Sequence, residues 1–495
     1  MGMAQQLKQP TAIICTSGSA LLNYYPAISE AFYSNIPLVV ISADRPKERI
    51  DIGDGQTIRQ EGVFKNHILF EANLSNPEDL DYSSVNEENE NLIHQALNSA
   101  TSDLGPVHIN VPFSEPLYNT IKKEVEVDES EVQFIENKKA SYQLSLKDQE
   151  IWNKANKILI LAGVLSPNSI DETLLDQLLN DPRVLFLTET TSNLYHKKII
   201  SNIDQLVLKL PEESQKDLQP DLLISVGGMV VSKKVKAFLR NFSPKTHWHI
   251  DPKKAYDTYF CLSKHFKQSA SSFFTSLNYD ELTISDYQEY WLYQHQIKKD
   301  NFNDYLHSAP YSDLKVFESV LKYLPQNTHL QLSNSSTIRY TQLFKIPNGT
   351  EVFCNRGTSG IDGSTSTAIG ASLYNKKPTV LITGDLSFLY DSNALWNNYI
   401  PSNFKIIIIN NSGGGIFRIL PGDKNAPYYS EFLETNHNLT AEHLSKMYGF
   451  NYETILSLNE CENKLVNFYE SKEKSVLEIF TPSTINDTVL LNSFF

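Results

Sequence analysis

Cysteine, which could fix a fold covalently or bind zinc, is scarce in this chain of 495 residues. The four cysteines, at positions 15, 261, 354 and 461, include no Cys-x-x-Cys spacing, so neither a disulfide framework nor a zinc site is predicted, and a cytoplasmic location fits best. The chain also lacks an apolar run near the ~18 residues of a membrane-spanning helix, and its start lacks the pattern of a secretion signal. These absences argue against membrane insertion and secretion.

Positive charge is also in short supply, because 43 lysines and arginines face 58 aspartates and glutamates, for a formal net charge of −15. A nucleic acid or an anionic membrane requires a basic surface, so neither is a predicted partner. A small anionic ligand would need a local cationic pocket instead. Apolar residues make up 41% and charged residues 20%, the balance of an ordinary globular protein, and the length predicts about three domains at ~150 residues each.

Short apolar runs alternate with helical stretches along the chain. Near-continuous runs of this length are typical of strands that are buried on both faces, as in a parallel sheet covered by helices. We therefore expect an α/β fold with three doubly wound parallel sheets. The predicted strands lie at residues 11–15, 36–41, 106–111, 158–161, 184–187, 222–226, 247–250, near 330 and 352, and at 379–383, 405–409 and 475–480.

The spacing of these runs predicts where the domains divide. Residues 121–139 are rich in lysine and glutamate without apolar periodicity and suit a linker, while residues 285–309 form a polar, tyrosine-rich helical span. Residues 1–8 have the pattern of the last turns of an amphipathic helix that leads at once into a strand, so the first domain is expected to be N-terminally incomplete. The predicted domains are residues 1–120, 141–284 and 310–495.

Polar motifs follow two consecutive predicted strands of the last domain. Gly384 and Asp385 end one strand, and Asn411 with glycines from Gly413 onward follows the next. Ligands of open α/β sheets bind at the carboxyl ends of the strands, so these two ends should be neighbours. Each motif alone is ordinary turn chemistry. Together they predict a site for a divalent cation and a diphosphate, and Ser387 adds a hydroxyl at the start of the following helix.

Six oxygen ligands surround Mg²⁺, and proteins usually supply only some of them. The candidates here are the Asp385 carboxylate, the Asn411 amide oxygen and the Gly413 carbonyl, and diphosphate oxygens and water would complete the shell. Mn²⁺ accepts the same oxygens. No G-x-G-x-x-G follows a strand, so a plain dinucleotide site is not predicted.

The pattern matches the thiamine-diphosphate signature, with Leu386 where a glycine is usual. Residues 384–395, together with Asn-Arg-Gly-Thr-Ser-Gly-Ile-Asp-Gly at 355–363, closely resemble the 2-succinyl-5-enolpyruvyl-6-hydroxy-3-cyclohexene-1-carboxylate synthase family (MenD). The resemblance is strong in the first and third domains and weak in the middle one. Further matching stretches lie at residues 16–20, 43–46, 107–113 and 415–420.

The resemblance implies a transferase of menaquinone biosynthesis. Members decarboxylate 2-oxoglutarate and add the succinyl-semialdehyde carbanion to isochorismate, using thiamine diphosphate and Mg²⁺ or Mn²⁺, as homodimers or homotetramers. The implied metal ligands are Asp385, Asn411 and Gly413. The implied cofactor contacts are Ile361, which props the cofactor into its bent form, and Gly384, Leu386 and Ser387.

Both substrates are dianions, which suits arginine because its planar fork pairs with carboxylates. Arg45, Arg339 and Arg356 stand on the matching motifs, although surface ion pairs remain an alternative for each. Lys234 stands where the family commonly has an arginine. The resemblance further implies polar substrate contacts from Gln56, Asn334 and Ser335, and an apolar wall of Ile416, Phe417 and Leu420, for which core packing is the default role.

Two alternatives stay open. The chain could be another thiamine-diphosphate decarboxylase or synthase of 2-oxo acids, such as pyruvate, although three arginines would then be unexplained. It could also bind the cofactor without activating it, because the family's activating glutamate lies upstream of the position that corresponds to Met1.

Overall fold

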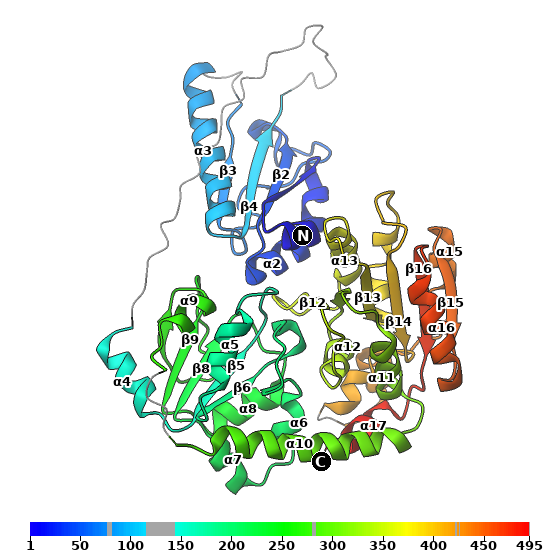
Figure 1. Cartoon of the computed structure of the whole chain (residues 1–495). Helices are drawn as coiled ribbons and strands as arrows, with labels where there is room; N and C mark the ends of the chain where they lie inside the picture. Colours follow the sequence, from blue (N-terminus) through cyan, green and yellow to red (C-terminus); the bar gives the residue numbers. More distant parts are fainter. Residues whose placement is uncertain (77–81, 115–143, 280–283, 421–422, 425, 495) are drawn as a thin grey trace. The chain divides into compact units, whose positions relative to one another are not determined.

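The computed structural model describes residues 1–76, 82–114, 144–279, 284–420, 423–424 and 426–494 (Figure 1). The described strands form three sheets, and every strand pairing in them is parallel. This confirms the predicted α/β class. The predicted linker at 121–139 and the domain ends at 120 and 141 lie outside the described residues. No described helix has both the length and the apolar character that crossing a bilayer demands.

The chain divides into two compact units. The first comprises Met1–Lys139 and Asn355–Lys376, and the second comprises Ala140–Cys354 and Lys377–Phe495. The first unit holds one of the three sheets and the second holds two. The predicted bounds of three domains therefore stay a prediction.

The sheet of the first unit has the strand order β1-β2-β4-β3. Strand β2 is almost wholly buried, whereas β1 alternates half-buried and exposed residues. The short helix α1 packs against α13 so closely that a Cβ on Gly2 would lie 2.0 Å from the Thr367 carbonyl oxygen. The elements are β1 (Thr11–Cys15), β2 (Leu38–Asp44), β3 (Phe70–Asn73), β4 (Pro106–Pro112), α1 (Gly2–Leu7), α2 (Tyr25–Ser34), α3 (Tyr82–Ser102), α13 (Ser364–Ser372), η1 (Gly18–Tyr24) and η2 (Lys47–Arg49).

The second unit begins with a sheet in the order β10-β9-β8-β5-β6-β7. Its central strands β5 and β8 are fully buried, as their apolar sequences predict. The strands are β5 (Ile158–Ala162), β6 (Val184–Leu187), β7 (Ile199–Ile200), β8 (Leu222–Val226), β9 (Thr246–Ile250) and β10 (Leu262–Phe266). The helices are α4 (Leu146–Lys154), α5 (Glu172–Leu179), α6 (Ile203–Val207), α7 (Glu212–Leu218), α8 (Lys233–Asn241) and α9 (Ala270–Thr275), with η4 (Thr190–Ser192).

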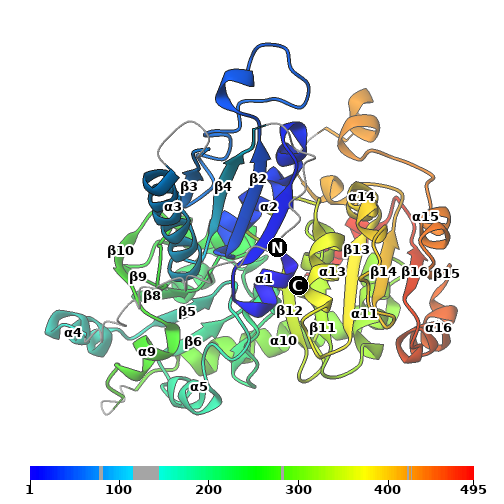
Figure 2. The ribbon, with the colours of Figure 1, turned by 90° about the horizontal axis from the view of Figure 1, so that it is seen from above.

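The other sheet of this unit has the order β12-β11-β13-β14-β16-β15, and Figure 1 shows β13, β14 and β16 side by side. Helix α14 continues directly from β13 and packs against both β13 and β14 (Figure 2). The strands are β11 (His329–Leu332), β12 (Glu351–Cys354), β13 (Thr379–Gly384), β14 (Lys405–Asn410), β15 (Asn451–Ile455) and β16 (Ser475–Phe480). The helices are α10 (Tyr287–Ser308), α11 (Asp313–Tyr323), α12 (Ser336–Thr341), α14 (Asp385–Tyr390), α15 (Glu442–Met447), α16 (Leu458–Glu470) and α17 (Asn486–Asn492), with η5 (Ser392–Leu395), η6 (Gly415–Ile419) and the π-helix η7 (Tyr429–Leu433).

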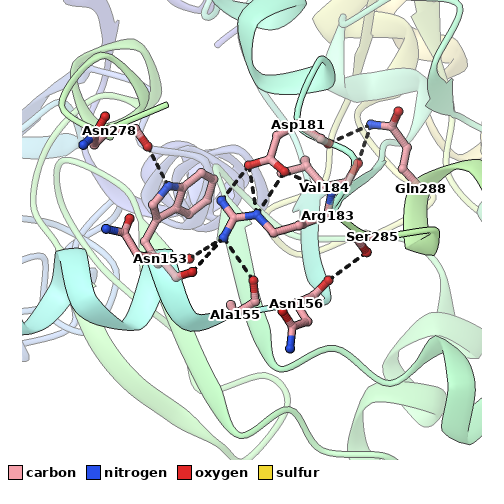
Figure 3. A network of polar contacts seen from close by, with 10 residues as sticks. Asn153, Ala155, Asn156, Asp181, Arg183, Val184, Asn278, Ser285 and Gln288 are labelled. Atoms are coloured by element: carbon pink, nitrogen blue, oxygen red, sulfur yellow. Dashed lines mark hydrogen bonds and ion pairs between the residues drawn. The ribbon is translucent and has the colours of Figure 1, made fainter. Parts of the chain in front are cut away.

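A buried arginine joins the C-terminal end of α4 to the strand β6 (Figure 3). Arg183 is 1% exposed and its Nε and Nη2 atoms donate to the Asp181 carboxylate, with Nη2 at 2.7 Å from Oδ2. Nη1 donates to the carbonyl oxygens of Trp152, Asn153 and Ala155 at 3.0 to 3.1 Å. These carbonyls end helix α4, where a cation is favourable. The guanidinium of Arg183 therefore has all its hydrogen-bond partners within the protein.

Candidate functional site

The carboxyl ends of β13 and β14 bring the two polar motifs together. The two strands pair in parallel with Gly384 opposite Ile409, so the residues that follow them meet at one edge of the sheet. The backbone N–H of Gly413 donates to Oδ2 of Asp385 at 2.9 Å. The motifs are neighbours, as the sequence predicts.

Asp385 is the first residue of α14 and is only 5% exposed. Its Oδ1 atom accepts the Leu386 N–H at 2.7 Å, and its Oδ2 atom lies 3.3 Å from Nε2 of His437. The Leu439 N–H donates to Nδ1 of His437, so the imidazole directs a protonated Nε2 at the carboxylate. The nearby carboxylate raises the pKa of His437. Among the ion pairs of the described residues, this imidazole is the sole partner of Asp385.

The two consecutive asparagines after β14 differ in what their side chains do. Both ends of the Asn410 amide are hydrogen-bonded within the protein. Nδ2 donates to the Leu439 carbonyl and to Glu478, and Oδ1 accepts the Ser412 N–H. Asn411 instead donates Nδ2 to Oδ2 of Asp313 at 2.9 Å. The amide oxygen of Asn411 is thus the end that is left to meet a ligand.

The loop after Asn411 needs glycine at position 413. Gly413 has a φ of 144°, and a Cβ there would lie 2.5 Å from the Glu434 carbonyl oxygen. Its neighbour Gly414 donates its N–H to that same carbonyl oxygen at 2.6 Å. Gly384, by contrast, is open, because a Cβ there would meet nothing within 4 Å. The backbone on this side is therefore bare enough for a phosphate to approach closely.

These donors fit a divalent cation that shares its ligands with a diphosphate. A buried carboxylate, an oriented amide oxygen and a loop carbonyl are hard oxygen donors, and Mg²⁺ usually takes one or two protein carboxylates with phosphates and water. Within the described ranges, no cluster of three or more histidine, cysteine, aspartate or glutamate side chains offers an all-protein metal cage. Ser387, in the first turn of α14, is 4% exposed, and Leu386 beside it is half-buried.

The predicted apolar wall is not part of the core. Ile416 and Phe417 lie in η6 and are half-buried, and Leu420 just after η6 is 36% exposed. Apolar side chains placed this way remain available to a ligand, so the default role of core packing does not apply to them.

Lys234 and Arg339 act on the same carboxylate. Burial raises the pKa of Asp204, and the nearby charges of Arg339 and Lys234 oppose that rise. Asp204 accepts a short hydrogen bond from Ser232, the N-cap residue of α8, which carries Lys234. The structure thus places these two predicted substrate cations in one neighbourhood. Sequence reasoning missed Asp204, which no motif marks.

The turn from β11 into α12 holds the other predicted polar residues of this unit. Asn334 is 2% exposed and accepts the Cys354 thiol at 3.4 Å. Ser335 has a φ of 68°, which is strained for a residue with a side chain. The Ser335 carbonyl accepts Nη1 of Arg339 at 2.5 Å. Strain of this kind is concentrated at functional sites.

Four predicted site residues lie in the first unit: Arg45, Gln56, Arg356 and Ile361. Arg45 follows β2, and its N–H donates to Asp44, whose other oxygen accepts Asn110. Gln56 is exposed and has a φ of 57°. Ile361 is half-buried.

Gln60, which sequence reasoning missed, joins the segments that carry Arg45 and Gln56. It is fully buried, accepts the Gly18 N–H at 2.8 Å, and donates to the Ala43 carbonyl and to Asn110. Gly18 has a φ of 85° and lies against the Gln56 backbone, where a Cβ would approach within 3.2 Å. The mostly polar stretch 56–60 gives no sign in the sequence that Gln60 is buried.

A third missed residue, Glu30 of α2, holds the loop that carries Arg356. The carboxylate is 5% exposed and accepts the N–H groups of Gly357 and Thr358, each at 2.6 Å. It also accepts the Thr358 and Ser34 hydroxyls at 2.9 and 2.7 Å. Four donors on one carboxylate fix both the loop and the negative charge.

Three family models match the chain in the regions of the three sheets. Residues 1–68 match the model described as "Thiamine pyrophosphate enzyme, N-terminal TPP binding domain", residues 126–332 match "Middle domain of thiamine pyrophosphate", and residues 335–479 match "Thiamine pyrophosphate enzyme, C-terminal TPP binding domain". Thiamine pyrophosphate is another name for thiamine diphosphate. The last match contains both motifs at the ends of β13 and β14.

The chain is similar to proteins that bear the name 2-succinyl-5-enolpyruvyl-6-hydroxy-3-cyclohexene-1-carboxylate synthase, among them those of two Flavobacterium species and of Christiangramia forsetii. The protein of Flavobacterium psychrophilum is 52% identical over 495 residues, that of Flavobacterium johnsoniae 50% over 500 residues, and that of Christiangramia forsetii 50% over 515 residues. The three alignments cover 100% of this chain and 88%, 88% and 89% of the respective relatives.

Proposed function

This chain belongs to the family of 2-succinyl-5-enolpyruvyl-6-hydroxy-3-cyclohexene-1-carboxylate synthases, and we propose that it carries out the family's reaction in menaquinone biosynthesis. In that reaction 2-oxoglutarate loses CO₂ and the remaining fragment is joined to isochorismate. The observation that carries the proposal is the 52% identity over the whole length of the chain. Thiamine diphosphate, when bound, supplies the electron sink for the decarboxylation.

For the cofactor we propose a divalent cation, Mg²⁺ or Mn²⁺, held by Asp385, Asn411 and the Gly413 carbonyl. The buried carboxylate of Asp385, the oriented amide of Asn411 and the loop that requires glycine at position 413 support this set. The Ser387 hydroxyl would donate to the diphosphate beside Gly384 and Leu386, and Ile361 would support the cofactor's bent form. The protein's part is then to neutralise charge and to hold the reacting groups in place.

For the substrates we propose that cationic side chains bind the carboxylates, because two dianions must be held in a chain of net charge −15. Arg45 and Arg356 are the candidates in the first unit, and Lys234 and Arg339 are those in the second. The shared neighbourhood of Lys234 and Arg339 supports their assignment. Polar contacts are assigned to Gln56, Asn334 and Ser335, and the apolar wall to Ile416, Phe417 and Leu420.

We further propose a homodimer or homotetramer and a cytoplasmic location. The first rests on the family. The second is supported by the four cysteines, all within the described residues, none of which forms a disulfide. Size measurement in solution with and without cofactor tests the oligomer.

The substrate assignment is tested by steady-state assays of this chain with thiamine diphosphate and Mg²⁺. We expect CO₂ release from 2-oxoglutarate and isochorismate-dependent product, and no turnover of pyruvate. Turnover of pyruvate alone would contradict the assignment. Hydrogen exchange at the thiazolium carbon, followed by NMR, distinguishes an activating enzyme from a binding protein: exchange no faster than in free cofactor would overturn the proposed catalysis.

A further inference from the structure

Asp313 is a buried carboxylate beside the proposed cation site. It is the first residue of α11 and is 2% exposed. Among the ion pairs that the described residues form, none involves Asp313, and the carboxylate of Asp385 is close enough to act on it electrostatically. A buried negative charge without a cation is unfavourable. A cation bound at Asp385 would therefore also compensate this second buried carboxylate.

Each oxygen of Asp313 has a defined donor. Oδ1 accepts the Thr481 hydroxyl at 2.6 Å, and Oδ2 accepts Nδ2 of Asn411 at 2.9 Å. The backbone N–H of Asp313 donates to Oδ1 of Asn486 at 2.8 Å, which fixes the start of α11. The carboxylate is therefore held rigidly, and one of its two oxygens is committed to Asn411.

The bond to Asn411 decides which end of that amide is presented. A primary amide has a donating nitrogen and an accepting oxygen, and only the oxygen can bind a cation. Because a carboxylate can only accept, Asp313 selects the orientation in which the nitrogen is occupied and the oxygen is available. Asn410 shows the alternative, since all of its amide is used by the fold.

We propose that Asp313 is a positioning residue of the cation site. It orients the Asn411 oxygen toward the divalent cation and adds a second buried negative charge, without itself touching the metal. The inference deepens the proposed function and rests on the assignment of Asn411 as a metal ligand. Second partners of this kind typically change metal affinity by about 10- to 100-fold.

A purely structural role has to be separated from this one. A carboxylate in the first turn of α11 stabilises that helix, and its bond to Thr481 ties α11 to the end of β16. Both effects act on folding and not on the cation. Thr481→Val removes the bond to Oδ1 and leaves the bond to Asn411, so it is the matched control.

The test measures Mn²⁺ binding by electron paramagnetic resonance at saturating thiamine diphosphate, in the unchanged chain and in its variants Asp313→Asn and Thr481→Val. We expect the Kd for Mn²⁺ to rise about tenfold or more in Asp313→Asn and by less than about twofold in Thr481→Val. At saturating Mn²⁺, kcat of Asp313→Asn should recover to near the wild-type value, because the charge acts through metal affinity. Asp313→Ser replaces Asp313→Asn if the latter does not fold, as judged by circular dichroism.

A wild-type Kd in Asp313→Asn overturns the inference, and so does an equal loss of affinity in both variants. The failure of the proposed function looks different: the wild type itself would then bind no Mn²⁺ with thiamine diphosphate. A kcat that stays low in Asp313→Asn at saturating Mn²⁺ would also contradict a positioning role.

Discussion

The second unit contains two buried charged centres that contrast in how complete they are. Around Arg183, one guanidinium meets one carboxylate and three helix-end carbonyls, so every charge has a partner (Figure 3). At the ends of β13 and β14, the carboxylate of Asp385 has one ion-pair partner, the imidazole of His437, and the carboxylate of Asp313 has none among the described ion pairs. The first centre is closed, and the second lacks positive charge.

This difference separates a structural role from a ligand site without any reference to relatives. Burying a charge is unfavourable unless a partner compensates for it, so a closed centre serves the fold. An open centre favours a ligand of the opposite sign, because such a ligand compensates the buried charge. The sequence hides the distinction, because Asp181 and Arg183 flank a proline in what looks like a surface turn.

The largest effect on stability is expected when Arg183 is removed from the closed centre. Arg183→Ala leaves Asp181 buried without a cation and three carbonyls without a donor, so the free energy of unfolding should fall by about 3–5 kcal/mol. Urea denaturation followed by circular dichroism measures it. Arg240→Ala, at an exposed arginine that donates to the Thr258 carbonyl, is the control and should cost less than about 1 kcal/mol. Equal losses in the two variants would mean that closure of the Arg183 centre contributes nothing.

Removing a carboxylate from the open centre should weaken cation binding without lowering the free energy of unfolding. Asp385→Asn is expected to weaken Mn²⁺ binding by more than about 100-fold, since it removes a metal ligand. Without the cation, its free energy of unfolding should equal or exceed that of the wild type, because an uncompensated buried charge is gone. Metal titration and urea denaturation test the two parts. A destabilisation like that of Arg183→Ala would show that the centre is structural after all.

Two buried neutral histidines make the stability of the second unit depend on pH. His247 and His249 both bond to the Ser225 hydroxyl, at 2.7 and 2.8 Å, and burial lowers the pKa of each to about 4. In the unfolded chain each would accept a proton near its ordinary pKa of about 6.5, so the unfolded state binds more protons at intermediate pH. Stability that is present at pH 7.5 is therefore lost as pH falls toward 4.

At pH 5 the expected loss is about 2 kcal/mol for each of these histidines. His247→Gln should reduce the fall in stability between pH 7.5 and pH 5, measured by urea denaturation at each pH. His443→Gln, at an exposed histidine, is the control and should leave the fall unchanged. If both variants follow the wild-type profile, proton uptake at His247 does not govern acid stability.

The strands that the sequence fails to predict share a position. Every interior strand contains an apolar run from which it could be predicted. The four unpredicted strands, β3, β7, β10 and β15, all lie at sheet edges. An edge strand has one neighbour and often one exposed face, so its sequence need not be continuously apolar. Strand β15, for example, alternates exposed and half-buried residues before its buried last residue.

The site shows a similar limit. Asp385 and Asn411 could be predicted because each directly follows an apolar strand and the two motifs reinforce each other. Asp313 and Glu30 could not, because their partners lie 98 and 327 positions away and their own surroundings carry no motif. Their roles follow from burial and from the donors that surround them, which only the folded chain displays.

The smallest expected effect concerns Glu30, a buried carboxylate that is held by four hydrogen-bond donors and supports a predicted substrate residue. In Glu30→Gln the amide nitrogen would face a backbone N–H of Gly357 or Thr358, so the loop that carries Arg356 should lose its fixed position. We expect the KM for a carboxylate substrate to rise about tenfold with a smaller change in kcat. Ser34→Ala removes one donor and leaves the loop bonds, so it is the control and should keep KM within about twofold. A fall in kcat without a change in KM, or an equal rise in KM in both variants, would mean that the hydrogen bonds of Glu30 stabilise the fold and do not position Arg356. The two buried charged residues therefore differ in what they hold. Arg183 joins the end of α4 to β6, whereas Glu30 holds the loop that carries Arg356.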